Sequence, residues 1–204
     1  MMFQDLPASA ITQYHEQAHA RAGWPREGGL HTGKPEHDPW LWIETNHRYN
    51  SLLWAEEDLA RRKDVPDAAI ALNKRAIDGF NQKRNDAVEK IDEAILSRLA
   101  SITPQAGARL NSETAGSMID RLSIMSLKIK AMREQTLRTD VDAAHIESCQ
   151  AKLAKLLEQR GDLAGCLDTL LTQAAAGSAY YKIYRQFKMY NDPKLNPQLY
   201  KSGA

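Results

Sequence analysis

"FNQKRNDAVEKIDE", residues 80–93, is a helical segment with an unusual share of Asn, Gln and carboxylate side chains. At 100° per residue, the apolar side chains in and around it form one stripe: Ile77, Phe80, Ala87, Val88, Ile91 and Ile95. Arg84 falls in the middle of this stripe. An adjoining sector about 100° wide holds a set that we call the polar ridge: Asp78, Asn81, Gln82, Asn85, Glu89 and Asp92. The polar residues are therefore gathered beside the expected core.

The preceding helical segment has a comparable polar sector beside Leu53. Its members are Asn46, Asn50, Glu57 and Arg61. Glu56 falls within the apolar stripe of the same segment. Because an unpaired buried charge is very costly, we expect Arg84 to meet Glu56 or Glu57 across the helix interface.

Two interpretations of the polar ridge are open. In the first, it is a buried polar network that fixes the register of the helices. In the second, it is a site, because carboxylates at i, i+3, i+4 and i+7 on facing helices can bind divalent metals inside bundles. The metal ligands would be Glu57, Asp58, Asp78, Glu89 and Asp92. The abundance of Asn and Gln favours Mg²⁺ or Mn²⁺ over Zn²⁺.

The second interpretation assigns roles to individual residues. The expected catalytic residues are Glu57, Arg84, Asn85 and Glu89. The expected substrate-binding residues are Asn46, Asn50, Arg61, Lys74, Asn81, Gln82 and Lys188. Arg84 and Lys74 would neutralise a phosphate, so the substrate would be a nucleotide, a sugar phosphate or a nucleotide sugar. The reaction would be metal-assisted hydrolysis.

The remaining sequence predicts an all-α antiparallel bundle of about five to six helices. Helical periodicity is expected over these segments: 8–22, 40–63, 66–100, a fourth from Ser112 or Thr114, 140–159 and 162–190. The irregular parts are expected to be loop 23–40, segment 101–114 and an extended tail over 191–204. The chain is therefore expected to form a single helical domain over residues 1–204.

The segment "AYYKIYRQFKMYNDP", residues 179–193, interleaves aromatic and basic side chains. On a helix, its aromatic residues would form a packing stripe. The alternative is a basic rim, including Lys188, around a ligand cleft.

Composition limits the classes of partner and location. The 204 residues carry a net charge of +1, which does not favour nucleic-acid binding. No apolar run is long enough to span a membrane. Two cysteines, Cys149 and Cys166, are too few for a disulfide framework and suggest a reducing compartment, so a cytoplasmic protein is expected.

The sequence "HEQAH", residues 15–19, matches the H-E-x-x-H pattern of zinc proteases. It lies close to the N-terminus, and "ARAGWP" after it lacks the further histidine of the extended pattern. Partly exposed residues on an amphipathic helix are therefore the preferred interpretation, although His15 could face the polar ridge.

Several segments together resemble the bacterial family known as domain of unknown function 4254. They are "ETNHRYNSLLWAEEDLAR" (44–61), "KRAIDGFNQKRNDAVEKIDE" (74–93), "GSMIDRLSIMSLKIKAMRE" (116–134) and "YRQFKMYNDPKLNPQLY" (184–200). The motif positions include Asp120, Arg121 and Lys128 as well as most of the polar residues named above. The resemblance implies a one-domain, largely helical protein, often linked to surface-polysaccharide genes, with no established activity to carry over.

A weaker likeness is to all-helical nucleotide pyrophosphohydrolases, which bind Mg²⁺ through E-x-x-E and E-x-x-D pairs. "EKID" (89–92) supplies the second pair, but the first is missing. A second hypothesis is therefore a non-catalytic accessory or binding protein that docks a glycosyltransferase, with the polar ridge as a structural network. The Met-rich stripe that begins at Met118 could serve a homodimer interface as well as a core.

Overall fold

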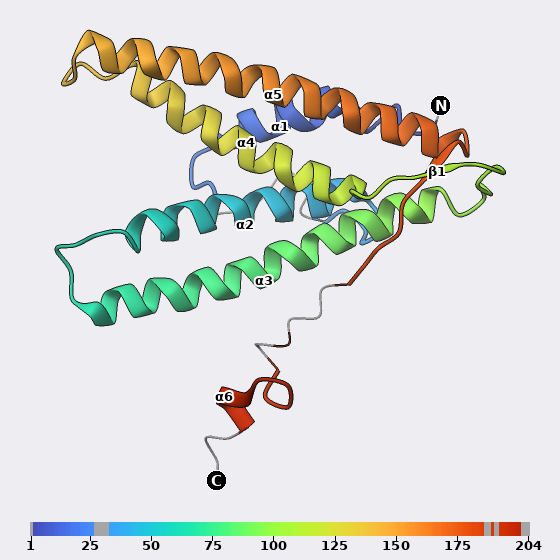
Figure 1. Ribbon diagram of the computed structural model, residues 1–204, viewed down its shortest axis with the longest axis horizontal. Helices are drawn as coiled ribbons and strands as arrows, with labels where there is room; N and C mark the ends of the chain where they lie inside the picture. Colours follow the sequence, from blue (N-terminus) through green and yellow to red (C-terminus); the bar gives the residue numbers. More distant parts are fainter. Residues whose placement is uncertain (1, 27–32, 186–188, 190–191, 201–204) are drawn as a thin grey trace.

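The computed structural model describes residues 2–26, 33–185, 189 and 192–200, and within them the protein is almost entirely helical (Figure 1). The helices are α1 (Ala8–His19), α2 (Pro39–Leu59), α3 (Asp67–Arg98), α4 (Ala115–Thr136), α5 (Ala143–Ala175) and α6 (Pro197–Tyr200). The strands are β1 (Arg109–Leu110) and β2 (Ala179–Tyr180), which pair in parallel. The prediction of an all-α bundle is confirmed. No helix among the described residues is long and apolar enough to cross a membrane.

The bundle consists of two antiparallel helical hairpins. In Figure 1, α2 and α3 form one layer, and α4 and α5 form the other. Helix α4 contacts both α2 and α3, whereas α1 packs against α4 and α5. Helix α4 is therefore the central helix, because it contacts both helices of the other hairpin.

Side-chain caps fix the starts of three of the long helices. The carboxylate of Asp38 accepts a hydrogen bond from the Trp40 N–H, and Pro39 occupies the first turn of α2. Thr114 caps α4 by accepting from the Ser117 N–H, and Asp142 caps α5 in the same manner. These side chains satisfy N–H groups that have no partner within the helix.

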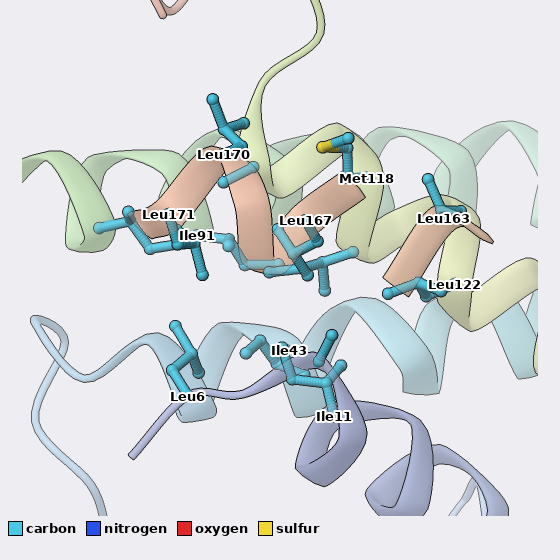
Figure 2. Close-up of a cluster of buried hydrophobic side chains, with 14 of the residues drawn as sticks. Leu6, Ile11, Ile43, Ile91, Met118, Leu122, Leu163, Leu167, Leu170 and Leu171 are labelled. Carbon is cyan, nitrogen blue, oxygen red and sulfur yellow. The ribbon is translucent and has the colours of Figure 1, made fainter. Parts of the chain in front are cut away.

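The apolar core lies where all five long helical segments meet (Figure 2). Its side chains come from α1 to α5 and from the segment before α1; they include Leu6, Ile11, Ile43, Ile91, Met118, Leu122, Leu163, Leu167, Leu170 and Leu171. Leu167 of α5 and Ile91 of α3 are both fully buried, so the two layers share one core. Burial of apolar surface on this scale is the main stabilising term of the fold.

Helix α5 differs from the prediction in being continuous through "RGD" (160–162). Gly161 is exposed and has open space around its Cα, so nothing forces the chain to turn there. A glycine inside a helix costs only about 1 kcal/mol. The buried stripe of Leu163, Leu167 and Leu170 outweighs that cost.

The predicted helix over 162–190 is wrong between residues 176 and 185. Gly177 has φ +73, a conformation that L side chains rarely adopt, and it turns the chain out of α5. Residues 179–180 then pair with β1, and residues 181–185 have no regular secondary structure. Over residues 180–185 the aromatic side chains therefore do not share one helix face: Tyr181 is buried and Tyr184 is exposed.

The tail is not wholly extended, because α6 forms one short turn within 191–204. Pro197 stands at its start, where its missing N–H is no loss. The side chain of Asn196 accepts from the Gln198 N–H and caps the turn. The expected extended conformation is therefore wrong over Pro197–Tyr200, because proline favours the first turn of a helix.

Candidate functional site

A chain of hydrogen-bonded polar side chains crosses the contact between α2 and α4. Asp120 Oδ1 on α4 accepts from Asn46 Nδ2 at 2.7 Å and from Asn50 Nδ2 at 2.9 Å. Asn50 Nδ2 also lies 3.0 Å from Ser123 Oγ, and that hydroxyl is 2.8 Å from His47 Nδ1. Asn46, Asn50, Ser123 and His47 are all buried. The chain therefore satisfies polar groups that would otherwise destabilise the core.

Arg84 on α3 lies at the outer end of this chain. Its Nη2 donates to Asn85 Oδ1 at 2.9 Å, and its Nη1 lies 3.7 Å from Asp120 Oδ2. Its Nε is buried and has no hydrogen-bond partner among the described residues. The guanidinium therefore keeps donor capacity that the surrounding protein does not use.

The predicted partners of Arg84 are wrong. Glu56 accepts a hydrogen bond from Asn73 Nδ2 at 2.6 Å, and Glu57 forms an ion pair with Arg61 at 2.9 Å. Arg84 meets Asp120 instead, because α4 lies across the α2–α3 hairpin and brings its own carboxylate to the interface.

A cleft of about 370 Å³, which we call the polar cleft, opens beside Arg84. It is lined by Asn50, Leu53, Trp54, Glu57, Asp58, Arg61, Ile77, Asn81, Arg84, Ile124 and Leu127. Its volume is within the range of small-molecule pockets. The predicted site residues that it brings together are Asn50, Glu57, Asp58, Arg61, Asn81 and Arg84.

Two further predicted residues lie next to the polar cleft without lining it. Asn46 is fully buried within the hydrogen-bonded chain, and Asn85 is buried beside Arg84. Both therefore fit the first interpretation of the ridge, as parts of a buried polar network.

The remaining ridge residues lie elsewhere on α3. Exposed Lys74 forms an ion pair with Asp78 at 2.5 Å, and Gln82 donates to Asp86 at 2.6 Å. Glu89 forms an ion pair with Arg185 of the segment after β2 at 2.5 Å. Each of these three carboxylates therefore has a donor or a cation as its partner at or near the surface. Lys188, also predicted to bind substrate, lies outside the described residues.

Asp92 is the one buried carboxylate of the ridge, and it supports the start of α4. Its Oδ1 accepts from the Gly116 N–H at 2.7 Å. Burial raises the pKa of Asp92 to about 6, although hydrogen bonds from Thr114 and Gly116 favour the charged form. Asp92 therefore acts as a structural link between α3 and α4.

The five carboxylates predicted to bind a metal do not form one centre. Glu57 and Asp58 line the polar cleft, Asp78 and Glu89 are paired with cations, and Asp92 faces α4. Within the described ranges, no three His, Cys, Asp or Glu side chains are grouped so as to hold a metal ion. Binding of Mg²⁺ or Mn²⁺ stays a prediction.

Three histidines, whose proximity was not predicted from the sequence, lie at the inner end of the hydrogen-bonded chain of side chains. His15 and His47 stack with ring centroids 4.4 Å apart, and His19 lies 4.9 Å from His47. His19 Nε2 is 3.0 Å from Ser126 Oγ, and the Trp24 ring stacks on the other side of His47. We call these three residues the histidine cluster.

The preferred interpretation of "HEQAH" is wrong for His15, which is fully buried. No hydrogen bond or ring contact among the described residues brings His15 to the polar ridge: its ring stacks on His47, which ends the hydrogen-bonded chain between α2 and α4. His47 could have been found from its spacing, since Ile43, His47 and Asn50 recur at i, i+4 and i+7 on the buried face of α2.

Burial keeps the histidine cluster neutral at pH 7. Desolvation, together with the nearby His19 and Arg160, lowers the pKa of His15 to about 3. Desolvation and Lys130 lower the pKa of His19 to about 4. The pKa of His47 also falls well below its usual range, mainly through burial. The cluster is therefore uncharged under physiological conditions.

Asp120→Ala is expected to lower the free energy of unfolding by about 2–4 kcal/mol, because the buried amides of Asn46 and Asn50 lose their acceptor. Asp120→Asn keeps an acceptor oxygen and is expected to lose less than half as much. Urea unfolding followed by circular dichroism measures both variants. Equal losses for Ala and Asn would show that the charge of Asp120 matters more than its acceptor role.

The class of protein is thus an all-helical bundle with a small cleft of mixed charge, backed by a buried network of Asn, Ser, Asp and His. The chain belongs to the family described as protein of unknown function (DUF4254), which matches residues 40–183. This match includes α2 apart from Pro39, α3 to α5 and the whole lining of the polar cleft, and it excludes α1. Comparisons with curated proteins and with solved structures found no match.

Proposed function

We propose that the protein binds a small phosphorylated sugar, such as a sugar phosphate or a nucleotide sugar, in the polar cleft. The carrying observation is Arg84, which lines the cleft with a partly exposed side chain and whose nearest described carboxylate is Asp120, 3.7 Å from Nη1. The planar guanidinium suits an anionic oxygen, and charge-assisted hydrogen bonds are the stronger ones. Asp120, at 3.7 Å from Nη1, holds the group in place without saturating it.

The other side chains of the cleft suit the hydroxyl groups of a sugar. Asn50 and Asn81 offer amide groups, and Trp54 offers an aromatic surface with a polar edge. Arg61 and Arg84 are balanced by Glu57 and Asp58, so the cleft has no excess of either charge. That balance favours a ligand with many hydroxyl groups and one anionic group over a polyanion.

Calorimetric titration with glucose 1-phosphate, UDP-glucose and glucose tests this proposal. We expect the phosphorylated ligands to bind, and Arg84→Met to weaken them roughly 10- to 100-fold because a charge-assisted contact is lost. The matched control is Arg62→Met, because Arg62 is exposed and does not line the polar cleft. Unfolding curves for each variant separate loss of binding from loss of folding. Failure of both phosphorylated ligands to bind, or unchanged binding by Arg84→Met, would contradict the proposal.

Metal-assisted hydrolysis at this cleft is a further step of the same proposal. The carboxylates available to it are Glu57 and Asp58, the two that line the cleft. Repeating the titrations with Mg²⁺ and following phosphate release tests it. Phosphate release that Glu57→Gln abolishes would favour an enzyme. Binding without release would favour the accessory role.

A further inference from the structure

A second hollow, of about 500 Å³, lies beside the polar cleft, and we call it the apolar groove. It is lined by Trp54, Lys128, Ala131, Met132, Gln135, Lys152, Lys155, Leu156 and Gln159. Trp54 also lines the polar cleft, so the two hollows meet at this side chain. The two hollows are therefore neighbours that share the Trp54 side chain.

The groove runs between the two helices of the α4–α5 hairpin. Its α4 wall is formed by residues 128, 131, 132 and 135, and its α5 wall by 152, 155, 156 and 159. Both sets have the i, i+3, i+4 and i+7 spacing of one helix face, so each wall is about 10 Å long. The floor is apolar, with Met132 and Leu156 half-buried. Such a floor suits a hydrocarbon chain.

The rim of the groove is basic. Lys128, Lys152 and Lys155 line it, whereas no Asp or Glu is part of its described lining. Lys155 forms an ion pair with Glu158, but Lys128 and Lys152 form none with any described residue. The positive charge of the rim therefore attracts an anion. Together with the apolar floor, it favours a ligand that is both apolar and negatively charged.

We infer that the ligand is an anionic amphiphile, whose phosphorylated polar head occupies the polar cleft and whose hydrocarbon chain occupies the apolar groove. This inference rests on the proposed function and narrows its ligand class. Trp54 contributes to both parts, since its ring borders the head and the chain. The lysines at the rim of the groove attract the negatively charged ligand, and Arg84 in the polar cleft contacts its phosphate.

Calorimetric titration with n-octyl phosphate, n-octyl glucoside and inorganic phosphate, each below its micelle concentration, tests the inference. We expect n-octyl phosphate to bind at least 10-fold more tightly than either of the others, because only it offers both chain and charge. Met132→Glu places a carboxylate in the floor and is expected to weaken n-octyl phosphate at least 10-fold. Lys152→Glu is expected to weaken it about 5- to 10-fold. The control is Lys63→Glu, at an exposed position outside the groove.

The two proposals fail in different ways. If glucose 1-phosphate binds through Arg84 but n-octyl phosphate binds no better than inorganic phosphate, the amphiphile is excluded and the proposed function stands. If n-octyl phosphate binds but no phosphorylated sugar does, the proposed function is excluded. Equal binding of n-octyl glucoside and n-octyl phosphate would show that the lysines play no part, and would also overturn the inference. Met132→Leu, which preserves the apolar floor, should bind as the wild type does, and a urea unfolding curve of Met132→Glu separates loss of binding from misfolding.

Discussion

Acidification from pH 7 to pH 4.5 is expected to destabilise this protein by roughly 5–7 kcal/mol, before most surface carboxylates are protonated. The cause is the histidine cluster. His15 and His47 are fully buried, and burial lowers the pKa of His15 to about 3 and that of His47 well below its usual range. Against a total stability of about 5–15 kcal/mol, a loss of this size is a large fraction.

The direction follows from proton linkage. In the unfolded chain a histidine takes up a proton near pH 6.5, whereas in the folded protein His15 and His47 stay neutral until far lower pH. Their contribution is therefore complete above pH 6.5. It falls by about 1.4 kcal/mol per pH unit for each histidine as the pH drops below that value.

Asp92 opposes this loss in part. Burial raises its pKa to about 6, so its folded form takes up a proton before the unfolded form does, and stability increases as the pH falls below 6. Over the same window that gain is about 2 kcal/mol, which is smaller than the loss from two buried histidines. His19, with a pKa lowered to about 4, adds to the loss.

Urea unfolding of the wild type and of His15→Leu at pH 7, 6, 5 and 4.5 checks this prediction. Both ring nitrogens of His15 lack hydrogen-bond partners among the described residues, so leucine should be tolerated at pH 7 within about 1 kcal/mol. The variant should then lose about 1.4 kcal/mol less per pH unit below pH 6 than the wild type does. His37→Gln, at an exposed position, is the control and should keep the wild-type slope. If the stability of His15→Leu fell with pH as steeply as that of the wild type, His15 would not be a source of the acid destabilisation.

The helical pattern allowed much of α3 to be predicted from sequence. Four residues of the expected stripe, Ile77, Ala87, Ile91 and Ile95, are buried, and Arg84 lies at the interface. Periodicity is a local property, and the observed limits of α3, Asp67–Arg98, fall within the expected 66–100.

The partners of those side chains could not be predicted, because they depend on packing between helices distant in sequence. Asp120 reaches Arg84 only because α4 crosses the α2–α3 hairpin. Likewise, His15 meets His47 only because α1 closes the inner end of the same interface. A helical wheel gives the face of each helix but not which face it meets.

The end of α5 was missed for a different reason. The aromatic residues after Gly177 have helical spacing, but the positive φ of that glycine and the pairing of β2 with β1 take the chain away from the helix. Strands of two residues leave no periodicity to detect. The close approach of α3 to Gly116 of α4 could not be predicted either, because it depends on how two helices pack.

Gly116→Ala is expected to lower the free energy of unfolding by about 2–4 kcal/mol, although alanine is the better helix former. A Cβ at this position would lie 2.5 Å from the Val88 carbonyl oxygen and 2.9 Å from the Asp92 carboxylate. The nearest atom belongs to the backbone of α3, so it cannot move away as a flexible side chain could. Helix α4 would have to shift, and the hydrogen bond from the Gly116 N–H to Asp92 would be strained.

Gly79→Ala and Gly165→Ala are the matched controls, since both glycines lie within helices and have open space around them. Each should stabilise the protein by about 0.5–1 kcal/mol through helix propensity alone. Asp92→Ala should not rescue Gly116→Ala, because the Val88 oxygen remains in place. Urea unfolding of the four variants separates these effects. If Gly116→Ala were as stable as the wild type, the Val88 oxygen would have to lie further than 2.5 Å from the added Cβ. The helices α3 and α4 would then be further apart, and the contact between Arg84 and Asp120 would be weaker.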